Sequence, residues 1–200
     1  MKKMLMLLAC MLIAVQSHTQ NTIELTGKRR SDAVAEIVSK TKAIKSFAGN
    51  FRQTRTTTLL KESVVSSGKI SFERDGAIRW EYEKPQAKVI EIHGTTMSVD
   101  GISSGKNRMA KGIAGMVSGM LQEGKIADDK VFDFKLYDEG KTYKIKAKPQ
   151  RRDMQRMMSA IDITISKSDG TARKMMLTEK DGNSTVIEFF DLKVTKTPGM

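Results

Sequence analysis

The sequence is poor in cysteine, proline and aromatic residues: its 200 residues include one Cys, three Pro and 6% aromatic side chains. A single cysteine excludes an intramolecular disulfide framework and any zinc site built from several cysteines. Glycine and proline together make up only 18 residues, which argues against collagen-like repeats and proline-rich disorder. Apolar residues (39%) and charged residues (29%) are balanced as in a globular protein. A chain of this length buries roughly 70% of its unfolded surface in one domain.

Signatures of catalysis and of cofactor binding are also scarce. Of the two histidines, only His93 lies beyond the first twenty residues, and it stands in an alternating segment beside Gly94. No serine occupies a Gly-x-Ser-x-Gly elbow, and no phosphate-binding loop, dinucleotide-binding motif or EF-hand pattern occurs. The acidic pairs Asp128-Asp129 and Asp138-Glu139 adjoin lysine or a turn and fit solvated loops. We therefore expect neither an enzyme nor a protein with a metal or cofactor.

Acidic residues are outnumbered, because 35 basic side chains face 23 acidic ones for a net charge of +12. Such a surplus of positive charge favours anionic partners, and nucleic acid is the first candidate to consider. The basic residues are spread over the whole chain, however, and no basic run is interleaved with aromatics. We therefore expect no nucleic acid partner. The two alternatives left open are an anionic membrane surface and an acidic partner protein.

Residues 1–20 have the layout of a secretory signal peptide. Two lysines precede an apolar run from Met4 to Val15, which is too short to span a bilayer as a stable helix. The run is followed by small and polar residues that allow cleavage after any of three positions: Ser17, Thr19 and Gln20.

Two other interpretations of this segment fit less well. One is a buried N-terminal helix of the fold; the other is a lipoprotein signal ending at Cys10, which would have too short an apolar run before the cysteine and an apolar tether behind it. We expect residues 1–20 to be removed and residues 21–200 to form one domain. That domain keeps 33 basic and 23 acidic residues, a net charge of +10, with ten methionines and no cysteine. Such a domain suits a bacterial periplasm.

Apolar residues between Val34 and Phe51 recur at helical spacing and predict a helix over residues 32–48. Ser31 or Asp32 would be its N-cap, and Gly49-Asn50 its stop signal.

Short alternating segments dominate the rest of the chain and predict an antiparallel meander. In residues 80–83, for example, Trp80 and Tyr82 would face one side of the sheet and the two glutamates the other. Turn dipeptides such as Asp181-Gly182 separate the segments. The predicted strands are 51–60, 63–74, 77–84, 87–93, 95–100, 131–138, 141–148, 160–166, 172–179 and 184–195.

A segment rich in methionine and glycine, residues 106–124, interrupts this meander and predicts a second helix. Its three internal glycines, Gly112, Gly115 and Gly119, lower helix stability by roughly 1 kcal/mol each. Methionine makes its apolar face adaptable. A short third helical turn is predicted over residues 151–158.

An ordered set of residues resembles a known family. The set is Phe47, Phe51, Gln53, Gly68, Ile70, Phe72, Arg74, Gly76, Arg79, Trp80, Tyr82 and Pro85. It resembles the periplasmic outer-membrane lipoprotein carriers (LolA-type), whose signatures include Phe-x-x-x-Phe-x-Gln, Gly-x-Ile/Leu-x-Phe and Arg-Trp-x-Tyr. Residues 174–194 are similar to the family's late hairpin. The order of elements agrees over most of residues 31–195.

Two departures from the family are visible. Asp75 replaces the usual proline after Arg74, which predicts a less rigid turn. The chain stops at Met200, before the family's last Phe-rich strand. Either the sequence is truncated or one edge of the barrel is open.

The resemblance implies an α+β fold, an unclosed antiparallel β-barrel covered by about three helices around a hydrophobic cavity. It also implies a monomeric carrier of acylated lipoproteins between an inner-membrane lipoprotein-releasing ABC transporter and an outer-membrane acceptor. Such cargo needs a carrier, because a 16-carbon chain crossing water exposes about 15 methylenes, on the order of 12 kcal/mol at ~0.8 kcal/mol each. The alternative is a periplasmic lipid-binding or sensor module with the same fold.

The resemblance further implies two kinds of site residue. Arg74 matches the family arginine that hydrogen-bonds the lid helices in the closed state; a solvated charge at a strand end is the alternative. The residues implied to line the acyl-chain cavity are Phe47, Phe51, Phe72, Ile78, Trp80, Tyr82, Ile113, Met116 and Met120. For Ile78, Trp80 and Tyr82, ordinary core packing is an equally good interpretation.

Overall fold

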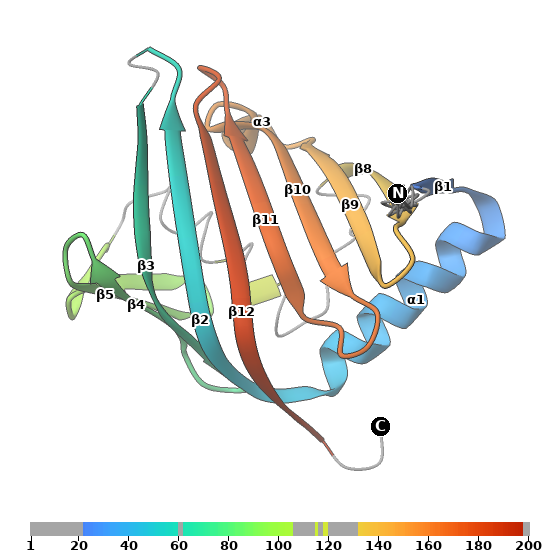
Figure 1. The fold of residues 1–200 in the computed structure, drawn as a ribbon, viewed down its shortest axis with the longest axis horizontal. Helices are drawn as coiled ribbons and strands as arrows, with labels where there is room; N and C mark the ends of the chain where they lie inside the picture. The colour runs from blue at the N-terminus through green and yellow to red at the C-terminus, as the bar shows by residue number, and fades with distance from the viewer. Residues whose placement is uncertain (1–21, 60–61, 106–114, 116–117, 120–131, 198–200) are drawn as a thin grey trace, which may run out of the picture.

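The protein folds as an open antiparallel sheet with one long helix lying against it (Figure 1). This computed structural model describes residues 22–59, 62–105, 115, 118–119 and 132–197. Twelve strands form one sheet in the order β1-β8-β9-β10-β11-β12-β2-β3-β4-β5-β6-β7. Their bounds are β1 (Ile23–Leu25), β2 (Ile44–Thr57), β3 (Glu62–Glu73), β4 (Ile78–Lys84), β5 (Lys88–His93), β6 (Thr96–Val99), β7 (Ile102–Ser103), β8 (Phe132–Asp138), β9 (Thr142–Pro149), β10 (Met158–Ser166), β11 (Ala172–Glu179) and β12 (Ser184–Lys196).

Two meanders meet at the centre of this sheet. Strands β2 to β7 form one meander and β8 to β12 the other, and the long strands β2 and β12 pair to join them. The two outermost strands, β1 and β7, have only three and two residues and stay unpaired with each other. The expected unclosed antiparallel sheet is thereby confirmed.

Most predicted strands lie within two residues of observed ones, because Gly or Asp at the separating turns adopts the left-handed backbone that ends a strand. Gly140, Gly170 and Gly182 all have positive φ angles. The outermost strands β1 and β7 were not predicted, since segments this short carry no alternation to detect.

The first helix begins and ends five residues earlier than predicted: α1 spans Gly27–Ala43, not 32–48. Its N-cap is Thr26 rather than Ser31 or Asp32, and its first turn has no acidic residue. The early start was missed because Gly27–Arg30 contains no apolar residue.

The predicted helix end was wrong because residues 44–48 belong to strand β2. Phe47 and Phe51 are four residues apart, a spacing that fits one face of a helix and also one face of a strand. Ile44 joins them on that face because the β2–β12 register shifts next to it. The supposed stop signal at Gly49-Asn50 lies inside β2.

The expectation of about three helices is not supported by the described residues. The predicted turn over 151–158 is a single turn, α3 (Arg152–Gln155). The predicted second helix falls mostly outside the described residues, of which Gly115, Ser118 and Gly119 are helical. In the described part of the chain, no helix is both long and apolar enough to cross a membrane.

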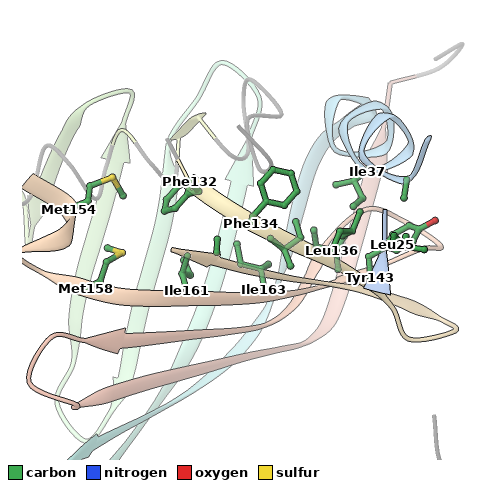
Figure 2. Close-up of a cluster of buried hydrophobic side chains, with 14 residues drawn as sticks. Leu25, Ile37, Phe132, Phe134, Leu136, Tyr143, Met154, Met158, Ile161 and Ile163 are labelled. Atoms are coloured by element: carbon green, nitrogen blue, oxygen red, sulfur yellow. The ribbon is translucent and has the colours of Figure 1, made fainter. Parts of the chain in front are cut away.

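Buried apolar side chains form two clusters on one face of the sheet. The first, which we call the α1 cluster, lies on strands β8 to β10 and includes residues of β1, α1 and α3; Figure 2 shows Ile37 of α1 above Leu136 at one end and Met154 and Met158 at the other. The second lies on β2 to β5 with Phe189 of β12. The cross-strand row Ile163–Met175–Ile187 connects them, so both clusters occupy the same face.

Candidate functional site

The second cluster contains every described residue that was predicted to line a cavity. We call these six residues the aromatic face: Phe47, Phe51, Phe72, Ile78, Trp80 and Tyr82. They come from three neighbouring strands, and the register aligns them in rows across the sheet. The longest row crosses six strands and is apolar throughout: Val194, Phe47, Phe72, Ile78, Ile92 and Met97. Directly opposed residues share a face and touch, so sheet pairing itself assembles this surface.

Aromatic rings pack against each other at two points of this face. The rings of Phe47 and Phe72 lie 5.3 Å apart between centroids. Those of Phe51 and Tyr82 lie 4.9 Å apart and nearly perpendicular, an edge-to-face contact. Gly68 stands between the second pair, opposite both residues. A Cβ at Gly68 would lie 1.9 Å from the carbonyl oxygen of Glu81, so only glycine allows this close approach of β3 and β4.

One polar group lies at the end of the aromatic face. The Tyr82 hydroxyl donates a hydrogen bond to Gln53 Oε1 at 2.9 Å. Burial raises the pKa of the Tyr82 phenol, which therefore stays neutral. The Lys88 ammonium lies 4.4 Å from the centre of the same ring and brings a positive charge to this end of the face.

The centre of the aromatic face is closed to solvent. Phe51 and Ile78 have 0% exposure and Phe72 has 1%, whereas Trp80 is half-buried. A ligand reaches the buried residues only when the side chains over them move. Trp80 is the member of the face that a ligand can touch first.

Arg74 follows β3 and binds the end of α1. Its Nε donates to the carbonyl oxygen of Ile44 and its Nη2 to that of Thr41, both at 2.8 Å. The last carbonyls of a helix have no partner within the helix, and a cation is favoured beside them. Arg74 therefore caps α1 and ties it to the strand that carries Phe72. Whether it also locks a lid, as predicted, is a separate question that stays a prediction.

The rest of α1 is tied to the opposite half of the sheet. The Tyr143 hydroxyl donates to Glu36 Oε2 at 2.7 Å, and Lys40 forms an ion pair with the same carboxylate. These two partners lower the pKa of Glu36, while burial and the carboxylate raise the pKa of Tyr143. Lys40 also donates to the backbone carbonyl of Lys167 in the β10–β11 turn. Helix α1 is thus a fixed part of the fold.

Close packing adds to these polar ties. Gly170 lies against α1 so closely that a Cβ there would be 2.7 Å from Cβ of Lys40.

Sequence reasoning found part of this site. Ile113, Met116 and Met120 were also predicted to line it and lie outside the described residues. Four further buried members were missed: Ile44, Ile70, Ile92 and Phe189. Alternation within each strand could have indicated them, but their place beside the aromatic residues depends on the register.

Together, these features define a class of protein: an open antiparallel sheet with one anchored helix and an aromatic surface on the same side. The family model "Outer membrane lipoprotein carrier protein LolA" matches residues 42–199, and the chain belongs to that family. It is 29% identical over 170 residues to the outer-membrane lipoprotein carrier protein of Chromobacterium violaceum. That match covers 82% of this chain and 79% of the relative.

Solved structures with a similar arrangement are more distant. The MucA/MucB complex of Pseudomonas aeruginosa matches with 16% identity and a TM-score of 0.47, over 84% of this chain and 58% of the matched one. This chain therefore spans little more than half of that protein. A LolA superfamily protein of Nitrosomonas europaea matches with 10% identity and a TM-score of 0.42, over 82% of this chain and 94% of the other.

Proposed function

We propose that this protein is exported to the periplasm and carries acylated lipoproteins, without catalysing a reaction. It would receive them from an inner-membrane lipoprotein-releasing ABC transporter and deliver them to an outer-membrane acceptor. The observation that carries this proposal is the aromatic face, whose row through Phe47, Phe72 and Ile78 is continued by apolar residues across six strands in a member of the LolA family. Acyl chains of the cargo would lie on this face.

The energetic demand on such a site is set by the acyl chain. Shielding a 16-carbon chain from water is worth on the order of 12 kcal/mol, at ~0.8 kcal/mol per methylene. The buried centre of the face must open to admit the chain, and it must close again when the cargo leaves. A carrier therefore needs a cover that is held by few interactions. In this proposal, the two hydrogen bonds of Arg74 to the end of α1 belong to the closed state.

The first test asks what the protein carries. The protein is purified from the periplasm of the producing cell, and mass spectrometry is used to identify whatever it retains. We expect acylated lipoproteins or free acyl chains. A preparation that contains neither, from cells rich in lipoproteins, would contradict the proposal.

A second test separates a carrier from a lipid-binding or sensor module. Arg74→Leu should leave cargo bound but abolish its transfer to outer-membrane vesicles. The variant lacks the two hydrogen bonds of the closed state, so closure no longer favours release of the cargo. A module that only binds would show no transfer with either protein. That result would favour the binding role over transport.

A further inference from the structure

The far end of the β2–β3 hairpin has an open edge. Strand β4 pairs with β3 only from Ser67, which lies opposite Lys84. In the described part of the chain, Glu62–Ser66 therefore have β2 as their only strand partner. Figure 1 shows this end of the hairpin extending beyond β4 and β5. Backbone N–H and C=O groups along such an edge are a template for another strand.

This edge carries two adjacent and exposed valines. Val64 is 56% exposed and Val65 is 53% exposed. Neighbouring residues of a strand point to opposite faces, so both faces of the segment are uncovered. Folded sheets commonly keep their edges short or charged, as the strands β1 and β7 do here. An unpaired edge of five residues with two exposed valines at its centre departs from that rule and indicates a partner.

The open edge lies close to the aromatic face. Val64 is four residues from Gly68, the point where the rings of Phe51 and Tyr82 meet, which corresponds to about 13 Å at ~3.3 Å per residue. A polypeptide whose acyl chain lies on the aromatic face can reach the edge with its first few residues.

We propose that the edge Glu62–Ser66 binds the extended peptide segment adjoining the acyl chain of the cargo and adds it to the sheet as a further strand. This inference rests on the proposed function. A peptide fits the edge better than lipid does, because hydrocarbon leaves backbone N–H and C=O groups unpaired. Five residues in a strand cover roughly 17 Å, and proline in the paired stretch would remove a donor.

The main test uses synthetic ligands and the unaltered protein. Binding is measured by calorimetry for palmitate and for a ten-residue peptide rich in serine and threonine that begins with a palmitoylated cysteine. Two analogues of the peptide are N-methylated at odd or at even positions. Only alternate residues of a strand direct their backbone N–H groups toward a given neighbouring strand. N-methylation at those positions removes the hydrogen bonds to the edge, so one of the two analogues should bind about tenfold more weakly than the parent peptide.

Matched variants locate the effect on the protein. The double variant Val64→Lys and Val65→Lys should bind the parent peptide about tenfold more weakly and bind palmitate as before. The control is Met176→Lys, since Met176 is also exposed (38%) but lies on a strand paired on both sides. This control should bind both ligands normally.

Three outcomes would overturn the inference. Equal binding of the parent peptide and both analogues by the unaltered protein, with palmitate still bound, refutes the edge and leaves the proposed function intact. Loss of binding to uncharged phosphatidylcholine vesicles in the valine variant, with peptide binding unchanged, assigns the edge to a membrane instead. Failure of the unaltered protein to bind palmitate refutes the proposed function and this inference together.

Discussion

The two apolar clusters share one face of the sheet but are covered in different ways. The α1 cluster is covered at one end by a helix that polar groups hold in place, through Glu36 and Lys40 of α1. Among the described residues, the tie between this helix and the strands of the aromatic face lies at the helix end, where Arg74 binds Thr41 and Ile44. Most buried residues of the first cluster are aliphatic, whereas the second contains two contacting pairs of aromatic rings.

We infer from this difference that the two clusters serve different purposes, one the stability of the fold and the other the binding of a ligand. A core under an anchored helix cannot admit a ligand without losing packing across the whole contact. A surface rich in aromatic rings that is tied to α1 through Arg74 would lose less packing on admitting an acyl chain of similar apolar character. We therefore propose that the α1 cluster serves stability and that the aromatic face serves ligand binding. The following variants test that division, beginning with the one that should change stability most.

Leu136→Ala removes a side chain with 0% exposure from the α1 cluster. The resulting cavity should lower the free energy of unfolding by about 3 kcal/mol, measured by urea denaturation. Palmitate affinity of the folded variant should not change. A large loss of affinity at temperatures where the variant is folded would break the division between the two clusters.

Arg74→Leu removes two hydrogen bonds from the end of α1. Because the donor is charged and the acceptors lie at a helix terminus, unfolding should become easier by about 2 kcal/mol. Arg79→Leu is the matched control, since Arg79 is a partly exposed arginine paired with Glu91 at 2.6 Å and its loss should cost less than about 1 kcal/mol. Equal losses in the two variants would show that Arg74 is only a surface charge.

Trp80→Ala shortens a half-buried residue of the aromatic face. Palmitate affinity should fall about tenfold, which corresponds to about 1.4 kcal/mol of lost contact. Leu177→Ala is the control, as Leu177 is also partly buried but packs against the α1 cluster. Calorimetry that finds the same affinity for both variants would contradict our assignment of the ligand to the aromatic face.

Tyr143→Phe removes the hydrogen bond to Glu36 and keeps the ring. We expect a loss of about 1 kcal/mol in the free energy of unfolding. A double-mutant cycle with Glu36→Gln should show coupling between the two residues. Independent effects would mean that this contact does not hold α1 on the sheet.

The pH dependence of stability gives the smallest effect. The pKa of Glu36 is lowered by Lys40 and Tyr143 from its ordinary 4.5. A carboxylate with a lowered pKa in the folded state stabilises the protein above that ordinary value, and the benefit is lost as the pH falls through the folded pKa. Glu36 is partly exposed, so the contribution is a few tenths of a kcal/mol. Glu36→Gln should reduce the slope of stability against pH below 4.5; an unchanged slope would contradict it.

The sequence predicts the meander well because turn dipeptides such as Asp181-Gly182 separate strands of ordinary length. It does not predict where α1 ends, since Ile44, Phe47 and Phe51 fit a helical face as well as a strand with a register shift. The candidate site could be predicted only in part, for a similar reason. The aromatic residues were found through a family resemblance, but the row joining Phe47 to Phe72 and Ile78 exists only through strand pairing. Pairing is a long-range property that local patterns do not contain.

The most direct test of the acyl-chain site uses Trp80, the single tryptophan of the sequence. A brominated fatty acid is titrated into the protein while tryptophan emission is recorded and binding is measured in parallel by calorimetry. Bromine quenches an indole only at close contact, so an acyl chain on the aromatic face should quench most of the emission, and unbrominated palmitate should restore it. Binding of the brominated acid with unchanged emission would place the chain elsewhere and contradict the central claim.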